Sequence, residues 1–320
     1  MYLYNIIENK NFKKILMKNK KLYLKNRRVI KVSGSTGINF LNNILTSDML
    51  KLKPNEIMPS ALLTPQGRIL FDLLLSIEQI NKTNDFQSVF IECDASQVDD
   101  LFSKINMYNL RKEVNIEKTK HKVFVVDNIK NSIARLEDKR FVNLSLGRIY
   151  DDYILEEDLS NYDCHENLNW YELYRYKNCI PEGPKEIISG VSLPLEINLD
   201  LLEGISFEKG CFIGQEVNAR IKWKGLVKKK YVSIELINYN EAIKEINLND
   251  EKRIYLFDNQ IGEVIELKYH KESNNFYGIA IIKLSYLYEF EKNQSLLCDF
   301  KNKKMKINFP NFLLPLPKKL

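Results

Sequence analysis

The sequence predicts an α+β fold in two parts, a larger mixed region over residues 29–230 and an all-β barrel over residues 231–320. Two patterns favour this class. In the larger region, apolar stretches with the alternation of β-strands stand between segments whose apolar residues recur at helical spacing. After Lys230, short β-branched and aromatic stretches follow one another between turns, as in a small barrel or sandwich. A length of 320 residues also suits two domains.

The mixed region begins with a predicted strand, turn and helix. Residues 29–32 alternate like a short strand, and Gly34 marks a turn before apolar residues at helical spacing from Ile38 to Leu45. The stretch 61–77 predicts a β-hairpin, because two apolar runs flank the polar turn at 65–67.

Further along, the sequence predicts strands and helices in alternation. The expected elements are strands at 88–93, 114–117 and 122–127, helices after Ser96 and at 168–177, and a loop from Pro181 to Pro194. The charge-rich stretch 128–165 predicts only short strands.

The formal net charge of +6 comes from one end of the chain. Residues 10–31 hold ten lysines and arginines and no acidic residue, so the rest of the chain is mildly acidic. This distribution disfavours a broad face for duplex nucleic acid. We assign residues 1–28 to a basic N-terminal arm, and two interpretations of the arm stay open. It is either a solvated leader or a segment that contacts RNA or an acidic partner.

The cysteine pattern predicts neither a disulfide framework nor a zinc site, because no C-x-x-C pair is present. The five cysteines are Cys93, Cys164, Cys179, Cys211 and Cys298. With no apolar run of 18 residues, we expect no membrane span and a reducing compartment. The cytoplasm is the expected location. The mitochondrial matrix is the alternative, because the N-terminal segment is basic and acid-poor like a transit peptide but lacks serines.

The densest group of special residues lies in the segment 209–216. It reads Lys209, Gly210, Cys211, Phe212, Ile213, Gly214, Gln215 and Glu216. We expect Gly214 to open a helix, which would put Cys211 near a helix N-terminus beside Lys209. The helix dipole and the cation would then lower the pKa of the thiol and make Cys211 a nucleophile, a redox centre or a metal ligand. The alternative is a small buried hydrophobic residue between flexible glycines.

The segment ISFEKGCFIGQEVNARIKWKGLVKKK, at 205–230, resembles the signature of the folate-binding YgfZ-like family. That family includes mitochondrial iron–sulfur maturation factors and is related to the glycine-cleavage aminomethyltransferases. Further motifs match in the family's order, which makes a chance match improbable. They are the Gly34 turn with Phe40, Leu41, Thr46 and Asp48, LTPQGRILFD at 63–72, Arg175 with Pro181, Glu182 and Gly183, and PLEINLD at 194–200.

The resemblance implies a ring of aminomethyltransferase-like, folate-binding α/β subdomains with a C-terminal β-barrel. It also implies a departure from the enzymes. Aminomethyltransferases carry adjacent aspartates where Phe71 and Asp72 stand here, and a glutamate where Lys177 stands. Since a phenyl ring neither accepts a proton nor stabilises an iminium, we expect one-carbon transfer to be lost. Cys179 also replaces a usual glycine and is a candidate redox partner for Cys211 if their Cα atoms lie within about 7 Å.

The implied function is that of an accessory factor for the assembly or repair of iron–sulfur clusters. Cys211 would be a redox handle or a bridging ligand of a cluster shared with A-type carrier proteins, for delivery to [4Fe–4S] client enzymes that include tRNA-modifying ones. In this interpretation Lys209 holds the thiolate, and Gly210, Phe212, Gly214, Gln215 and Glu216 shape the loop.

Tetrahydrofolate is the cofactor that the resemblance implies, and we expect its contacts to be Arg68, Asp72, Arg175 and Arg220. Two alternative functions stay open. One is a folate-dependent aminomethyl transferase, and the other is an RNA-interacting accessory protein that uses the basic arm.

Overall fold

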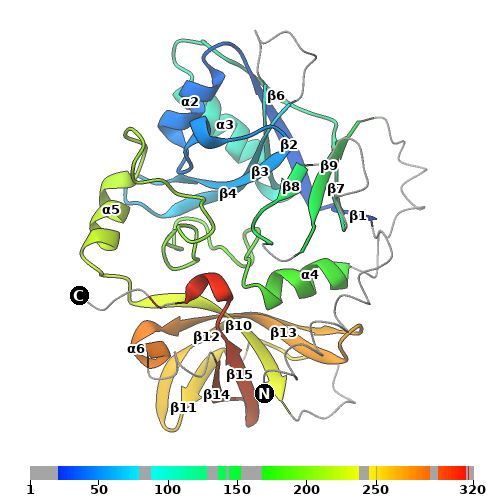
Figure 1. The fold of residues 1–320 in the computed structure, drawn as a ribbon, viewed down its shortest axis with the longest axis vertical. Helices are drawn as coiled ribbons and strands as arrows, with labels where there is room; N and C mark the ends of the chain where they lie inside the picture. The colour runs from blue at the N-terminus through cyan, green and yellow to red at the C-terminus, as the bar shows by residue number, and fades with distance from the viewer. Residues whose placement is uncertain are drawn as a thin grey trace.

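The computed structural model describes residues 21–78, 88–127, 136–141, 144–152, 168–237, 245–249, 251–288, 295–314 and 316. A mixed sheet with helices stands on one side of the molecule and a closed barrel on the other, with helix α4 (Leu168–Lys177) between them (Figure 1). The expected α+β class with a C-terminal barrel is confirmed.

The sheet of the mixed region has nine strands in the order β1-β7-β9-β8-β3-β4-β5-β2-β6. The strands are β1 (Lys21–Tyr23), β2 (Arg27–Ser33), β3 (Glu56–Leu63), β4 (Ile69–Ile77), β5 (Val89–Asp94), β6 (Asn115–Lys118), β7 (Lys122–Val126), β8 (Leu136–Asp138) and β9 (Gly147–Asp151). The pairing of β3 with β8 is parallel, and the other pairings described in this sheet are antiparallel. Strands β3 and β4 form the hairpin that the sequence predicts at 61–77.

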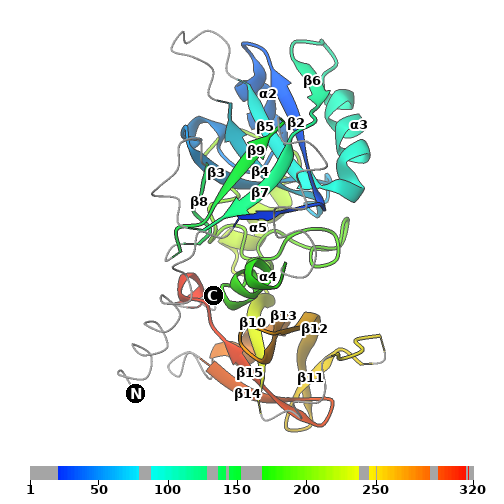
Figure 2. The same ribbon diagram turned by 90° about the vertical axis from the view of Figure 1, so that its right-hand side faces the viewer.

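Helices α2 (Gly37–Ile44) and α3 (Val98–Tyr108) pack on this sheet through their apolar faces, and Figure 2 shows α3 beside β2 and β5. Leu41 of α2 and Leu101 of α3 are fully buried in one core with Leu62 and Leu75 of the hairpin. Each such side chain contributes about 1.5–3 kcal/mol by leaving water. This core fixes the hairpin against both helices.

The residues assigned to a basic arm belong to the sheet region where the structure describes them. Residues 21–23 form β1, a turn follows over 24–26, and Arg27, which is buried, begins β2. The Nζ atom of Lys21 lies over the ring of Phe124, and Lys31 pairs with Glu78 at 2.7 Å. The described fold therefore includes residues before residue 29. Residues 1–20 and Cys164 lie outside the described residues.

The barrel closes in the order β10-β13-β12-β11-β14-β15, starting with the strand that opens at Lys229. Its strands are β10 (Lys229–Ile237), β11 (Arg253–Leu256), β12 (Asn259–His270), β13 (Asn275–Lys283), β14 (Ser295–Phe300) and β15 (Lys303–Asn308), with the short helix α6 (Leu284–Leu287) after β13. Buried side chains from all six strands form its core.

A further core joins the sheet, the turn-rich segment 178–214 and the barrel. It includes Leu63 of β3, Tyr176 of α4, Phe212 of the segment, and Tyr231 and Ile279 of the barrel. Helix α5 (Gln215–Trp223) follows the segment and lies at the edge of the molecule in Figure 1. The residue next to Cys211 is thus anchored where both parts of the fold meet.

Candidate functional site

The loop that carries Cys211 packs against the tip of the β3–β4 hairpin through two glycines. Gly67 and Gly214 both have positive φ, at 77° and 76°. A Cβ atom on Gly67 would lie 2.6 Å from Nδ2 of Asn218 and 3.2 Å from the carbonyl oxygen of Gly214. Because real Cβ contacts are longer, only glycine lets these backbones approach each other this closely.

Asn218 of α5 locks the same contact. Its fully buried amide Nδ2 donates to the carbonyl of Gly67 at 2.9 Å and to that of Gly214 at 3.0 Å. The sequence reading did not single out Asn218. An asparagine inside a predicted helix is the signal that could have identified it, because asparagine favours the helix interior only weakly and often bonds to backbone.

Lys209 anchors the loop to the end of α2. Its Nζ donates to the carbonyl oxygens of Asn42, Leu45 and Ser47 at 2.6, 2.5 and 2.7 Å. The last carbonyls of a helix lack partners within it, and an ammonium has three hydrogens to donate. All three ammonium hydrogens are used in these bonds, so none remains for the Cys211 thiolate. The sequence predicts instead that Lys209 holds this thiolate. Burial lowers the pKa of Lys209 to about 8.

Cys211 is exposed, whereas its neighbour Phe212 is buried in the core between sheet and barrel. A Cβ on the preceding Gly210 would meet nothing within 4 Å, so Gly210 has no steric role of the kind that Gly214 has. The predicted helix begins at Gln215, whose N–H donates to the carbonyl of Phe212 at 3.2 Å. Glu216 lies in its first turn, where the helix dipole favours a carboxylate.

The other described cysteines are buried thiols. Burial raises the pKa of Cys93 and of Cys298 to about 12, and it raises the pKa of Cys179 as well. Cys179 has φ +52°, a conformation that suits the glycine it replaces in the motif. Because Cys179 is fully buried and both thiols are free, the pairing of Cys179 with Cys211 is not formed in this structure. Among the described cysteines, solvent reaches Cys211 alone.

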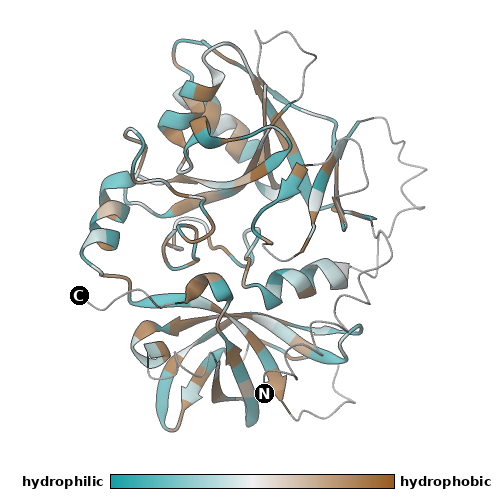
Figure 3. Cartoon of the chain, viewed as in Figure 1, coloured by the Kyte–Doolittle hydropathy of each residue, from teal (hydrophilic) through white to brown (hydrophobic). Residues whose placement is uncertain are grey.

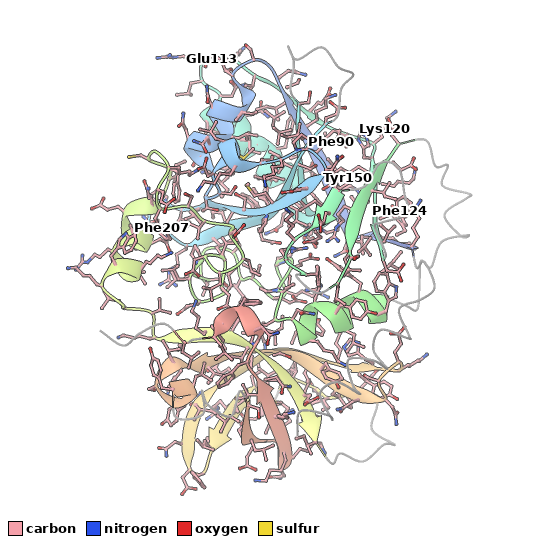
Figure 4. The ribbon with its side chains drawn as sticks, in the orientation of Figure 1. Phe90, Glu113, Lys120, Phe124, Tyr150 and Phe207 are labelled. Carbon is pink, nitrogen blue, oxygen red and sulfur yellow. The ribbon has the colours of Figure 1, made fainter. Side chains whose placement is uncertain are left out.

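Ion pairs fill the middle of the mixed region. The charged residues there are the half-buried Asp72 and Glu182 and the buried Arg27, Glu92, Asp138, Arg140, Arg148, Arg175 and Glu186. We call this set the ionic cluster. Tyr150, labelled in Figure 4, donates to Glu92 at 3.0 Å and packs edge-on against Phe90.

Glu182 is at the centre of the ionic cluster. Its Oε1 accepts from Arg140 at 2.6 Å, from Tyr171 at 2.6 Å and from Arg148 at 3.1 Å. Burial by itself would raise the pKa of Glu182, but Arg140, then Arg148 and Arg175, outweigh burial and hold the pKa well below its usual range. Glu182 is therefore an ionised carboxylate, and its Oε1 already accepts hydrogen bonds from three side chains of the same protein.

The cavity beside the ionic cluster is too small for a folate. It borders Asp72, Arg140 and Pro181 and encloses about 20 Å³, which is space for a water molecule. Pockets for cofactor-sized ligands usually measure about 300–1,000 Å³. Oδ2 of Asp72 already accepts from the N–H of Gly183 at 3.1 Å and lies 3.7 Å from Nη1 of Arg27. Tetrahydrofolate does not fit here unless the ionic cluster opens.

The four residues expected to contact folate are not brought together. Asp72 and Arg175 belong to the ionic cluster, where burial raises the pKa of Asp72 and Arg175 pairs with Glu186 at 2.6 Å. Arg68 is half-buried and donates to the carbonyl of Val191 at the hairpin tip, while Arg220 is exposed on α5. Arg68, Arg175 and Arg220 therefore lie in three different parts of the fold.

Fold and site together define a protein of the aminomethyltransferase fold with an exposed loop cysteine and a centre closed by ion pairs. The structure matches the glycine cleavage system aminomethyltransferase T from Bartonella henselae with a TM-score of 0.68 over 92% of this chain and 86% of that chain, at 13% sequence identity. At this identity the match establishes the fold alone. No protein-family model matches the chain.

By sequence, the chain is similar to the iron–sulfur cluster assembly factors named IBA57. It is 29% identical to the IBA57 homolog of Neurospora crassa over 242 residues, which cover 70% of this chain and 55% of the relative. It is 28% identical to IBA57 of Homo sapiens over 239 residues, covering 67% of this chain and 66% of the relative. The resemblance that the motifs indicate is thus confirmed.

The chain spans between 55% and 66% of the length of these two relatives. Both are named mitochondrial, which supports the mitochondrial alternative and not the cytoplasmic expectation. Within the described residues, no helix is long and apolar enough to cross a membrane. The described part of the chain also holds no group of three or more His, Cys, Asp or Glu side chains that could bind a metal ion.

Proposed function

We propose that this chain is an accessory factor in the assembly or repair of iron–sulfur clusters, with a cluster as its cargo. The observation that carries the proposal is the exposed Cys211 thiol, presented by a loop that is fixed to α2 through Lys209 and to the hairpin through Gly214. The names of the IBA57 relatives support the same role.

The fixed loop suits a thiol that must meet a partner. Phe212 is held in the core, so the backbone on either side of Cys211 is ordered before any partner arrives. A ligand held in place in advance loses less conformational entropy on binding. The side chains of the ionic cluster are paired with one another, which leaves the Cys211 loop as the chemically available part of the site.

Iron–sulfur clusters typically take four protein ligands, and Cys211 supplies one. We therefore propose that an A-type carrier supplies the others and that the complex serves [4Fe–4S] client enzymes, tRNA-modifying ones included. The Cys211 thiol gives its proton to water, and its thiolate Sγ takes one coordination position on iron from a solvent or carrier ligand. No electron is transferred in this exchange.

We place this function in the mitochondrial matrix, in line with the names of the relatives. The resemblance predicts tetrahydrofolate binding, but no step above uses it, and the dispersed contacts and the closed centre disfavour it. The same closed centre disfavours aminomethyl transfer, since Asp72 is already bonded to Gly183 and Phe71 stands beside it.

Anaerobic reconstitution tests the proposal. The wild-type chain, Cys211→Ala and Gly210→Ala are each mixed with iron, sulfide and an A-type carrier, and the visible absorption of the co-eluting complex is measured. Gly210→Ala is the matched control, because its new methyl group meets open space one residue away from the thiol. We expect a shared cluster with the wild type and with Gly210→Ala but not with Cys211→Ala. Equal absorption from all three complexes would overturn the proposal.

A further inference from the structure

Large apolar side chains remain in solvent along α5 and the linker after it. Val217 is 38% exposed, Trp223 67% and Leu226 48%. Ile188 and Val191 are also exposed, and their loop meets the same hairpin tip, where Arg68 donates to the carbonyl of Val191. Half of the ten exposed large hydrophobic side chains in the described part of the chain are thus in this region. A group of exposed apolar side chains of this kind usually marks an interaction surface.

A pocket opens between this helix and the preceding loop. It encloses about 130 Å³ and is lined by Leu193, Leu195, Glu196, Ile221, Leu226, Val227 and Lys228. An apolar cavity of about 150 Å³ holds a benzene molecule. The pocket is slightly smaller and therefore has room for one leucine side chain. We call the surface made of this pocket, Val217, Trp223 and the basic side chains between 220 and 229 the α5 face.

The α5 face is strongly basic. Between 215 and 229 the chain carries five basic residues and one acidic residue, Glu216, and Figure 3 shows mostly hydrophilic residues along α5. The basic residues are Arg220, Lys222, Lys224, Lys228 and Lys229. Nζ of Lys222 lies 4.6 Å from the ring centroid of Phe207 and 5.8 Å from that of Trp223. Only Glu196 brings a carboxylate to the pocket lining. A face of this charge favours an acidic partner.

The α5 face adjoins the Cys211 loop. Phe207, which precedes Cys211, packs against Trp223 at the far end of α5 with ring centroids 6.3 Å apart, and Figure 4 shows Phe207 beside the helix. The loop therefore runs alongside α5. From Gln215 to Ile221 the helix rises about 9 Å, so the pocket is within the footprint of any protein that reaches the thiol.

We propose that the α5 face is the docking surface for the protein with which Cys211 shares its cluster. The occupant is an acidic segment of that protein that inserts one leucine side chain into the pocket beside Leu226. This inference rests on the proposed function. A protein is favoured over RNA or an anionic membrane because the pocket matches a single side chain and lies beside an exposed cluster ligand.

The test titrates each variant of this chain against an A-type carrier loaded with its cluster and follows the visible absorption of the complex. Leu226→Glu places a negative charge in the pocket. Leu297→Glu is the matched control, because Leu297 is 57% exposed on β14 of the barrel, away from α5. We expect Leu226→Glu to raise the half-saturating concentration at least about tenfold while leaving the absorption at saturation unchanged. Leu297→Glu should match the wild type.

The same titration separates this inference from the proposed function. Cys211→Ala should lower the absorption at saturation, which reports the cluster ligand and not the docking surface. Equal half-saturating concentrations for Leu226→Glu and Leu297→Glu would overturn the docking surface alone. The absence of any wild-type complex would overturn both. Parallel titrations with bulk tRNA and with vesicles rich in phosphatidylserine complete the test. Binding of either that Leu226→Glu abolishes would overturn the choice of a protein occupant.

Discussion

Gly214 lies so close to Gly67 that a methyl group on Gly214 would be 3.0 Å from the Cα atom of Gly67 and 2.5 Å from the carbonyl oxygen of Thr64. The contact joins residues almost 150 positions apart in the chain and holds the Cys211 loop on the hairpin. It explains why two glycines with positive φ face each other here.

Gly214→Ala should therefore destabilise the protein by about 2–4 kcal/mol, because a left-handed backbone and a clash with the Thr64 carbonyl act together. Gly210→Ala, four residues earlier, should change stability by less than about 0.5 kcal/mol, since its methyl group meets open space. Urea unfolding of the two variants measures the difference. Equal stabilities would show that the glycine contact is not tight in solution.

Replacement of Lys209 should loosen the same loop from α2. Lys209→Met removes three hydrogen bonds and leaves the carbonyls of Asn42, Leu45 and Ser47 without this donor. We expect a loss of about 1–3 kcal/mol in the free energy of unfolding. Lys224→Met, on the exposed end of α5, serves as the control and should be neutral. If Lys209→Met unfolds at the same urea concentration as Lys224→Met, the anchoring role is disproved.

The lowered pKa of Glu182 predicts how the stability of the protein changes in acid. Its pKa in the folded state lies below the usual value of 4.5, so between the two values the unfolded chain binds more protons. The stabilisation from Glu182 is complete above about pH 4.5 and is lost as the pH falls through the folded pKa. Glu182→Gln should be less stable at pH 7, by about 3–5 kcal/mol, because it leaves buried arginines unpaired.

The sign of this effect is checked by repeating the urea unfolding at pH 7 and pH 3.5. The stability difference between Glu182→Gln and the wild type should shrink in acid. A difference that grows as the pH falls would contradict the ion-paired state of Glu182.

The closed centre makes a prediction about folate. Because the cavity beside Asp72 encloses about 20 Å³, a tetrahydrofolate titration should show no saturable binding below about 1 mM, with an aminomethyltransferase of the glycine cleavage system as the positive control. Saturation at micromolar ligand would mean that the ionic cluster opens and would restore the contacts expected from the sequence.

Local signals in the sequence were sufficient for much of the fold. The hairpin at 61–77 has apolar runs around the polar turn at 65–67, and the helix after Gly34 has apolar residues at helical spacing, so both could be predicted from neighbours in the chain. The start of α5 after Gly214 could also be predicted from neighbouring residues.

Contacts between distant residues could not be predicted in this way. Lys209 bonds to carbonyls more than 160 positions away, and Arg27 pairs with Glu92 at 2.7 Å, 65 positions away. From sequence alone, a basic residue is taken to be solvated because its ion-pair partner is not known. For this reason the sequence places Arg27 in the N-terminal arm. The motif located Cys211 together with Lys209 and Gly214, but the distant partners of Lys209 and Gly214 became visible only in three dimensions.

The most direct test of the central claim is the alkylation of Cys211 by iodoacetamide, followed by mass spectrometry of the peptide that contains it. In the native protein we predict that Cys211 is modified first among the described cysteines, because Cys93, Cys179 and Cys298 are buried. After addition of a cluster-loaded A-type carrier, we predict that Cys211 becomes protected, both in the wild type and in Gly210→Ala. Modification of Cys211 at an unchanged rate within a complex that retains its cluster would contradict the assignment of this thiol as a cluster ligand.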